Sequence, residues 1–286
     1  MDVFTDRVAV VTGASSGIGR STALALARRG VRVVASGRSQ TALESLVAEI
    51  RRLDRPASLF RADVSDPAQN EALVRFALER FGRIDIAVCN AGVYLRRPVR
   101  ELALKEIERC MAVNFFGAAA LIGLVLPLML ARNQGHIVAV SSMDGKKGLP
   151  PDAAYVASKF AVTGYMDVLR QELRGTNVRA STILPGRVDT PMIEHLRVPW
   201  ISRKIPSERV AAAILRAVEK NRAEVIVPFA GPKLLSLVNA FSPRLADWVV
   251  WRTGISGTGD TQGRGSESGE AGREHPAHMI HSQDAR

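Results

Sequence analysis

Two side chains able to exchange a proton, Tyr155 and Lys159, lie four residues apart, and Ser142 lies thirteen residues before the tyrosine. The segment that begins at Tyr155 has apolar residues at helical spacing, and residues i and i+4 of a helix share one face. We therefore expect the ammonium of Lys159 beside the phenol of Tyr155, where a positive charge lowers the phenol pKa from its usual value of about 10. Such a pair could serve as a general acid–base centre. The alternative is an amphipathic helix with an ordinary tyrosine and a solvated lysine.

A glycine-rich turn near the N-terminus suggests a second chemical function. An apolar run at residues 8–12 is followed by Gly13-Ala-Ser-Ser-Gly17-Ile-Gly19 and then by a helical pattern at about residues 18–29. Glycines let the backbone turn tightly and approach a pyrophosphate, and the start of a helix presents free N–H groups and a positive dipole end. Between a strand and a helix, this turn favours nucleotide binding over an ordinary loop.

Five motifs in matching order and spacing resemble the short-chain dehydrogenase/reductase family over about residues 5–230. They are Thr12 with Gly13–Gly19, Asn90-Ala-Gly92, Asn114, Ser142, and Tyr155 with Lys159. The resemblance implies one Rossmann-type domain that carries both the cofactor and the substrate site. It also implies an oxidoreductase that interconverts a ketone or aldehyde with an alcohol.

The resemblance implies a role for each of four catalytic residues. Tyr155 is the general acid–base group, and Lys159 binds the nicotinamide ribose while it lowers the phenol pKa. Ser142 hydrogen-bonds the substrate oxygen. Two alternatives stay open: the neighbouring Ser141 could have this role, and a serine at a strand end could instead cap a turn. Asn114 holds a water of the proton relay, although an asparagine there could also cap a helix.

We expect NADP(H) rather than NAD(H) as the cofactor. An acid just after the second strand would bind the ribose 2′-hydroxyl and repel a 2′-phosphate, but this position is Gly37 and Arg38 follows it. Arg38 could bind the phosphate, with help from Ser15 and Ser36. By resemblance Asp63 binds the adenine amino group, with helix capping as its alternative. The expected cofactor-binding residues are Gly13, Ser15, Ser16, Gly17, Ile18, Gly19, Arg38, Asp63, Val64, Asn90, Ala91, Gly92, Tyr155, Lys159, Pro185, Gly186, Val188 and Thr190.

Strand-like and helix-like segments alternate between residues 7 and 230. This rhythm predicts an α/β fold: a doubly wound, mainly parallel Rossmann-type sheet with helices on both faces. Ligands would bind beyond the carboxyl ends of the strands. The expected strands span residues 8–12, 31–35, 58–61, 84–89, 136–140, 178–184 and 225–228, and the expected helices about 18–29, 41–52, 67–81, 155–174 and 207–220, with two more between 102 and 131.

Composition divides the chain into three parts. Residues 1–230 form the expected catalytic domain, and residues 231–253 form an apolar extension that could be a lid, a subunit interface or a membrane contact. Trp248 and Trp251 suit a membrane interface because Arg244 and Arg252 stand beside them.

From residue 254 to residue 286 the chain is rich in Gly, Ser, Glu and His and lacks periodicity. We expect this part to be a disordered tail. His275, His278 and His281 recur in it at every third position, but we expect solvated side chains and no metal site.

Composition also excludes several classes of protein. The net charge is +11, yet lysines and arginines are scattered among acids and aromatic residues make up only 5%, so we expect no nucleic-acid partner. Cys89 and Cys110 are expected to be small buried residues rather than a disulfide or metal pair, which suits the cytoplasm. The first residues show no secretory signal. Residues 115–131 carry no charge, but we expect a helix packed on the sheet rather than a membrane span.

The residues that follow Thr190 are expected to form a lid over the substrate. Met192, Ile193, Leu196, Val198 and Trp200 would give this lid an apolar inner side, which hints at a hydrophobic substrate; alternatively they only pack the lid down. A different class of function is a non-catalytic nucleotide-binding or scaffold protein, possibly attached to a membrane surface. The resemblance implies a homodimer or homotetramer formed through the helices around residues 112–131 and 155–174.

Overall fold

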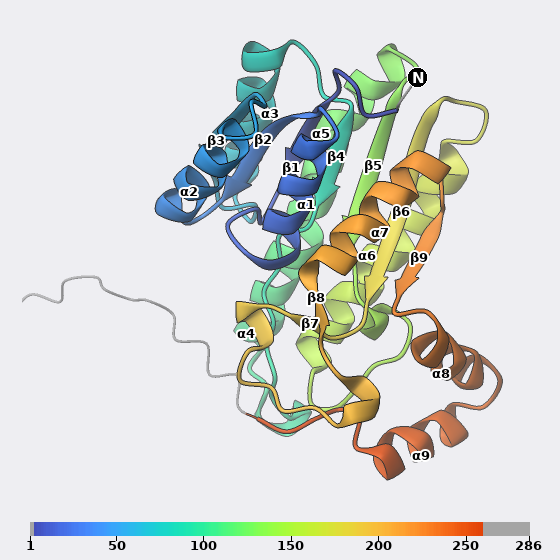
Figure 1. The fold of residues 1–286 in the computed structure, drawn as a ribbon. Helices are drawn as coiled ribbons and strands as arrows, with labels where there is room; N and C mark the ends of the chain where they lie inside the picture. Colours follow the sequence, from blue (N-terminus) through green and yellow to red (C-terminus); the bar gives the residue numbers. More distant parts are fainter. Residues whose placement is uncertain (1–2, 260–286) are drawn as a thin grey trace, which may run out of the picture.

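The computed structural model describes residues 3–259, which form one parallel sheet covered by helices on both faces (Figure 1). Seven strands run in the order β3-β2-β1-β4-β5-β6-β9, all parallel. Their bounds are β1 Val8–Val11, β2 Arg32–Gly37, β3 Ala57–Arg61, β4 Ile86–Cys89, β5 Gly135–Val140, β6 Val178–Pro185 and β9 Glu224–Val227. The expected doubly wound α/β fold is thus confirmed.

The direction of winding reverses between β1 and β4. The chain steps from β1 to β2 and β3 on one side, then crosses back to β4, β5 and β6 on the other. Such a switch point leaves a crevice at the carboxyl ends of the two central strands, which is where open α/β sheets bind ligands. Every residue of β1 and of β4 is buried, because helices cover both sides of these apolar runs.

Two hydrophobic cores fill the space between the sheet and its two helix layers. One core holds the inner faces of α1 (Gly17–Arg28), α2 (Gln40–Arg51) and α7 (Ser207–Lys220). The other holds those of α3 (Pro67–Phe81), α5 (Gly117–Ala131) and α6 (Ala153–Glu172). Local signals set the helix ends: α3 begins with Asp66 capping the Ala68 amide and Pro67 at its first position, and it ends at Gly82 with φ +75°.

The two helices expected between residues 102 and 131 are one continuous helical run. It consists of α4 (Leu104–Met111), a π-helical turn at Ala112–Phe116, and α5. By length and composition alone, residues 104–131 could cross a membrane, and this is the one such helix in the described chain. One face of α5 packs on the sheet through Leu121, Val125 and Met129, as expected of a buried helix.

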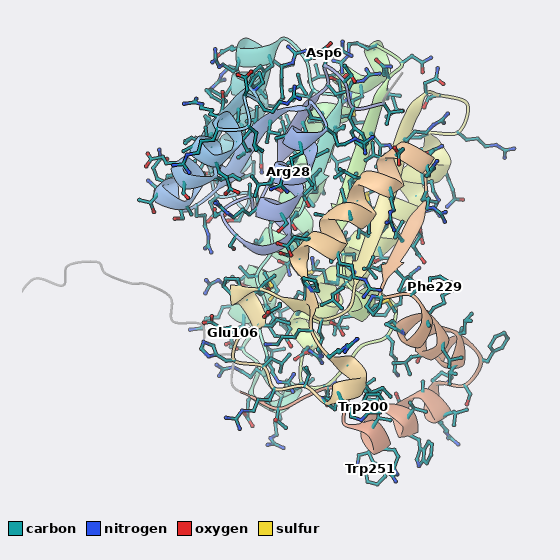
Figure 2. All side chains as sticks on the ribbon, in the orientation of Figure 1. Asp6, Arg28, Glu106, Trp200, Phe229 and Trp251 are labelled. Atoms are coloured by element: carbon teal, nitrogen blue, oxygen red, sulfur yellow. The ribbon has the colours of Figure 1, made fainter. Side chains whose placement is uncertain are left out.

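Beyond the sheet, a helical hairpin projects from the end of the molecule that carries the carboxyl ends of β6 and β9 (Figure 1). It consists of α8 (Ala230–Phe241) and α9 (Pro243–Thr253). Figure 2 labels Phe229, just before α8, and Trp251 in α9 on this projection, with Trp200 of the preceding lid beside it. None of the residues of α8 is buried.

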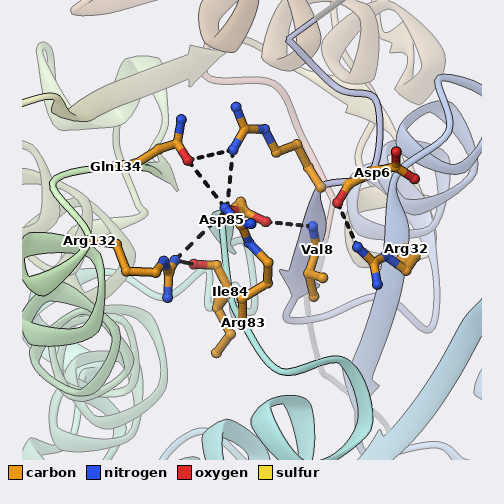
Figure 3. Close-up of polar contacts among 9 residues, drawn as sticks. Asp6, Val8, Arg32, Arg83, Ile84, Asp85, Arg132 and Gln134 are labelled. Carbon is orange, nitrogen blue, oxygen red and sulfur yellow. Dashed lines mark hydrogen bonds and ion pairs between the residues drawn. The ribbon is translucent and has the colours of Figure 1, made fainter.

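At the amino ends of the strands a buried carboxylate ties several elements together (Figure 3). Asp85 is 3% exposed and accepts hydrogen bonds from the Val8 amide at 2.9 Å and from Arg83 Nη2 at 2.6 Å. Arg7 and Arg132 approach the same carboxylate at 3.5 and 3.8 Å. This cluster joins the start of β1, the segment before β4 and the end of α5, at the end of the sheet opposite to the ligand crevice.

Candidate active site

A cleft of about 320 Å³ opens at the carboxyl ends of the central strands. Three of the four expected catalytic residues line it, and so do the expected cofactor-binding residues apart from Gly19. Sequence reasoning missed three apolar residues of the wall: Val93 in the loop after β4, Val113 in the π-helical turn, and Val140 at the end of β5. The expected residues in the lining are Gly13, Ser15, Ser16, Gly17, Ile18, Arg38, Asp63, Val64, Asn90, Ala91, Gly92, Ser142, Tyr155, Lys159, Pro185, Gly186, Val188 and Thr190.

The glycine-rich turn brings backbone to the floor of this cleft. Gly13 has φ +64°, and a Cβ there would lie 2.8 Å from the Cα of Ala91, so the close approach of the two loops requires glycine. Gly19 lies behind the turn, where a Cβ would lie 2.6 Å from Asn90 Nδ2. Ser16 is the N-cap of α1 but makes no side-chain cap bond. The first amides of α1 are therefore available to an anion in the cleft.

Asn90 supports the turn rather than pointing into the cleft. Its Nδ2 donates to the carbonyl oxygens of Thr12 at 3.0 Å and of Gly13 at 3.3 Å. The Thr12 hydroxyl in turn accepts from the amides of Asn90 and Ala91 at 3.1 and 3.2 Å. These bonds fix the loop after β1 to the loop after β4 across the switch point.

The end of the cleft near β2 and β3 carries Arg38 and Asp63. A Cβ on Gly37 would collide with Ser15 Oγ, so a side chain at the position expected to hold a selecting acid would require the Ser15 hydroxyl to move. Asp63 Oδ1 accepts from the Ser65 amide at 2.9 Å and from the Ser65 hydroxyl at 2.7 Å, while Asp66 caps α3. Burial alone would raise the pKa of Asp63, but the Ser65 bonds and the charge of Arg38 outweigh it and lower that pKa. A glycine turn, a helix start, a carboxylate acceptor and a cation together fit a dinucleotide.

Tyr155 and Lys159 lie in the first turns of α6, with the Lys159 Nζ 5.6 Å from the centre of the Tyr155 ring. The expected proximity of the two groups is confirmed. Nζ also donates to the carbonyl of Val140 at 2.9 Å, which holds the ammonium at the end of β5. Lys159 is only 4% exposed.

The expected lowering of the Tyr155 pKa is wrong for this structure. Burial raises the pKa of Tyr155, the negative charge of Asp144 adds to the rise, and a hydrogen bond with Ser142 acts in the opposite sense. Burial also lowers the pKa of Lys159 to about 8, against an opposing contribution from Asp144. The loss of water around the buried phenol is the largest contribution and sets the direction of the Tyr155 shift.

Ser142 and Ser141 point to different surroundings. Ser142 Oγ donates to Asp144 Oδ2 at 3.0 Å and accepts from the Asp144 amide at 3.0 Å, beside Tyr155. Ser141 Oγ donates to the carbonyl of Lys159 at 3.0 Å and lies 2.9 Å from Thr163 Oγ1, so it fastens β5 to α6. The geometry therefore favours Ser142 over Ser141 as the serine that meets a substrate.

Asn114 lies behind the cleft, in the π-helical turn. Its Oδ1 accepts from the Val93 amide at 2.7 Å, and its Nδ2 donates to the Val93 carbonyl at 3.0 Å and to Ser158 Oγ at 2.8 Å. It does not cap a helix. These contacts fix the loop after β4 to the start of α6, where Ser158 donates to the carbonyl of Tyr155. The expected water-holding role of Asn114 stays a prediction.

The lid is only partly as expected. It runs from β7 (Val188–Asp189) to β8 (Ile205–Pro206), with short 3₁₀ turns at Pro191–Ile193 (η4) and Trp200–Ser202 (η5). Met192 and Ile193 line the cleft, and Leu196 is buried. Trp200 was expected on the inner side but is 85% exposed, because its turn packs beside α9 instead of over the cleft.

A buried polar cluster beside Tyr155 was not foreseen. The Tyr94 ring stands edge-on to the Tyr155 ring at 4.9 Å, and its hydroxyl donates to Asp152 Oδ2 at 2.8 Å. Arg96 pairs with Asp152 at 3.4 Å and is 6% exposed. Buried charges persist only when paired and hydrogen-bonded, and their partners here are too distant in sequence for spacing to reveal them.

The same cluster binds the C-terminal segment. Arg96 donates to the carbonyls of Ser256 at 2.8 Å and Gly257 at 2.5 Å, and Arg187 donates to the carbonyls of Ile255 and Ser256 at 2.9 Å each. Thr258 pairs with Arg197 of the lid. The prediction that a disordered tail begins at residue 254 is therefore wrong for residues 254–259, because two arginines hold this stretch against the domain. Residues 260–286, with His275, His278 and His281, lie outside the described residues.

Cys89 and Cys110 are free and buried, as expected. Burial raises the pKa of Cys89 to about 12, so this thiol is not ionised near neutral pH. Between residues 3 and 259, no group of three or more His, Cys, Asp or Glu side chains is arranged to hold a metal ion.

Comparison with known proteins identifies the family. The family model for short chain dehydrogenases matches residues 7–199. The chain belongs to this family. It is 34% identical over 263 residues to the ketoacyl reductase HetN of Nostoc sp., covering 89% of this chain and 92% of the relative.

Solved structures give the same result. A short-chain dehydrogenase/reductase of Burkholderia phymatum in complex with NAD has a TM-score of 0.78 at 27% identity, covering 86% of this chain and 96% of that one. A single-substitution variant of the actinorhodin polyketide ketoreductase with NADPH has a TM-score of 0.74 at 31% identity, covering 79% of this chain and 97% of that one. The fold, the family and oxidoreductase activity are thereby established, and the two similar structures hold NAD and NADPH.

Proposed function

We propose that this protein is an NADP(H)-dependent oxidoreductase that interconverts an apolar ketone or aldehyde with the alcohol, with Tyr155 as the acid–base group. The observation that carries the proposal is the meeting of Tyr155, Lys159 and Ser142 at the wall of a cleft whose remaining lining fits a dinucleotide. Asn114 fastens this wall from behind.

In the direction of reduction, the carbonyl oxygen of the substrate lies between the hydroxyls of Ser142 and Tyr155. The bound cofactor supplies the hydride. Tyr155 donates its proton to the developing alkoxide. Burial raises the pKa of the phenol, so the proton is present on Tyr155 at neutral pH before the transfer. The Ser142 hydroxyl stabilises the negative charge on the oxygen, in the manner of an oxyanion hole. Lys159, held by the Val140 carbonyl, contributes positive charge below its pKa of about 8.

The apolar substrate is supported by Met192 and Ile193 at the mouth of the cleft. Two reductases of oxo groups on acyl or polyketide chains, HetN and the actinorhodin ketoreductase, are among the similar proteins. We therefore propose that the substrate is a carbonyl on an extended or ring-bearing hydrophobic molecule. We also propose that the protein acts in the cytoplasm.

The Tyr155→Phe variant tests the mechanism. Removal of the phenolic hydroxyl should lower kcat for NADPH-dependent reduction by at least about 100-fold, because no other group donates the proton, while the Kd of NADPH changes little. The measurement is NADPH oxidation against ketones and aldehydes of graded size, with calorimetric titration of the cofactor. Tyr165→Phe is the matched control, since Tyr165 lies on the outer side of the same helix and is 37% exposed. Unchanged turnover in Tyr155→Phe would contradict the mechanism. Cofactor binding without turnover on any substrate would point to the non-catalytic alternative.

The cofactor preference is tested at Arg38. Similar structures include complexes with NAD and with NADPH, so the family leaves this choice open. Loss of one charge-assisted contact to the 2′-phosphate in Arg38→Ala should weaken NADP(H) binding by about 10–100-fold and leave NAD(H) binding nearly unchanged. Arg52→Ala, at an exposed arginine after α2, serves as the control. Tighter binding of NAD(H) than of NADP(H) by the unaltered protein would overturn the preference.

A further inference from the structure

All three tryptophans of the chain lie at one end of the molecule. Trp200 belongs to η5, and Trp248 and Trp251 belong to α9; they are 85%, 56% and 77% exposed. Figure 2 labels Trp200 and Trp251 on this end. A shallow groove lined by Trp200, Ile201, Trp248 and Arg252 joins η5 to α9, so the two elements form one surface.

The helical hairpin extends this surface with two apolar stripes. On α8, Leu234, Leu237 and Phe241 are exposed at spacings of three and four residues, which places them on one face. On α9, Leu245, Trp248 and Trp251 are exposed at spacings of three. We name the surface formed by η5, α8 and α9 the tryptophan face. An exposed apolar surface that spans three elements marks an interaction site.

Cations surround these apolar side chains. Arg203 follows η5, Lys233 lies in α8, and Arg244 and Arg252 lie in α9. Asp247 is the acid of the two helices, and its carboxylate pairs with Lys147 of the main domain at 2.5 Å. The tryptophan face therefore offers positive charge and exposed Trp, Phe and Leu side chains together, the combination found on helices that lie in the interface of an anionic bilayer.

We propose that the tryptophan face binds an anionic lipid bilayer, with α8 and α9 lying in the interface. A second copy of this chain is a poorer occupant. In a two-fold contact the same patch meets itself, so the interface would hold Arg244 and Arg252 of both copies and only Asp247 as an acid from α8 and α9. Lipid phosphates instead pair with these cations while the aromatic rings enter the headgroup region.

The location of the tryptophan face bears on the substrate. Met192 and Ile193 line the cleft, and Trp200 stands on the tryptophan face, at opposite ends of the same lid. A bilayer bound there lies next to the lid, so a membrane-dissolved carbonyl compound reaches the cleft without crossing water. This part of the inference rests on the proposed function; binding to the bilayer does not.

The tryptophans make binding directly measurable in the full chain. Because none lies elsewhere, their emission should shift to the blue when vesicles of equal parts phosphatidylcholine and phosphatidylglycerol are added, and the protein should co-sediment with these vesicles. Vesicles of phosphatidylcholine alone should bind less, and salt should weaken binding to the anionic ones. The Arg244→Gln/Arg252→Gln variant should bind anionic vesicles about thirty-fold more weakly, through the loss of two charges near the surface. Trp248→Ser/Trp251→Ser should lose binding.

A matched control and an activity measurement separate the outcomes. Leu53→Ser removes an exposed apolar side chain after α2, away from the tryptophan face, and should bind vesicles as the unaltered protein does. If the proposed function is right, all variants should reduce a small water-soluble ketone at the normal rate. The vesicle measurements report binding alone, so they test the bilayer proposal even if no turnover is found. Absence of a blue shift with anionic vesicles would overturn the proposal. So would a concentration-dependent dimer that the tryptophan variant abolishes, because the second copy would then be the occupant.

Discussion

The carboxyl of Asp144 contacts Ser142 of the proposed active site, although no motif in the sequence identified Asp144. It accepts the Ser142 hydroxyl at 3.0 Å, and its charge raises the pKa values of Tyr155 and Lys159. Burial, reinforced by the charge of Asp152, raises the pKa of Asp144 itself to about 6. Above that pH the carboxylate opposes ionisation of the phenol and keeps Tyr155 in its protonated form.

Asp144→Asn should therefore shift the pH dependence of alcohol oxidation. Oxidation requires the phenolate, and loss of the negative charge lowers the pKa of Tyr155, so the rising limb of kcat/KM should move to lower pH. Asparagine keeps an oxygen that can accept the Ser142 bond. The profile is measured for the unaltered protein, for Asp144→Asn and for Asp189→Asn, which removes an exposed acid of the lid region. A limb that stays in place or moves upward contradicts this role for Asp144.

Individual residues were predictable where a local motif fixes them. The glycine turn and the Tyr155–Lys159 spacing identify groups that meet in the cleft, because a turn and a helix face are local geometry. Tyr94, Asp152 and Arg187 escaped prediction, since they acquire their partners only when distant segments pack. The direction of the Tyr155 pKa shift also failed, because sequence shows the neighbouring charge but not the burial that outweighs it.

Among the elements, the junction at Asp85 stabilises the fold away from the cleft. Asp85→Ala would leave the Val8 amide and the partly exposed guanidinium of Arg83 without their acceptor, at a cost of about 1.5–3 kcal/mol in the free energy of unfolding. Asp85→Asn keeps one acceptor and should cost less, about 1 kcal/mol. Urea unfolding measures both, with Glu71→Gln at an exposed position of α3 as the control. The Kd of NADPH should not change, because the junction lies at the opposite end of the sheet; equal stability of Asp85→Ala and the unaltered protein would show that the junction contributes little.

Most elements follow from periodicity because each strand is a buried apolar run and each covering helix has one apolar face. The exception is the run from α4 to α5. α5 is apolar on several sides, so periodicity does not show where it starts, and the π-helical turn that carries Asn114 leaves no pattern of its own. The segment 254–259 was missed for a different reason: it is held by backbone carbonyls, which every residue has.

At the scale of the whole molecule, α5 and α6 expose a second apolar surface, apart from the tryptophan face. Phe116, which adjoins α5, and Phe160 and Val168 of α6 are 59%, 45% and 54% exposed. We predict that two copies associate through this surface. Val168→Glu should convert the dimer to a monomer in light scattering at micromolar concentration, since a buried, unpaired carboxylate is costly. Leu53→Glu, at an exposed leucine after α2, should leave the dimer intact. A dimer that persists in Val168→Glu contradicts this interface.

The contacts of Arg96 and Arg187 with residues 255–257 can form only late in the synthesis of the chain. Arg96 and Ser256 are 160 residues apart, so the ribosome adds the carbonyl that Arg96 binds long after it has made the arginine. At about 5–20 residues per second, this interval lasts roughly 8–32 seconds. During that time the sheet up to β9 can form, yet the wall beside Tyr155 lacks the carbonyls that complete it. The contacts of Arg96 and Arg187 with residues 255–257 are thus among the last of the domain that synthesis makes possible.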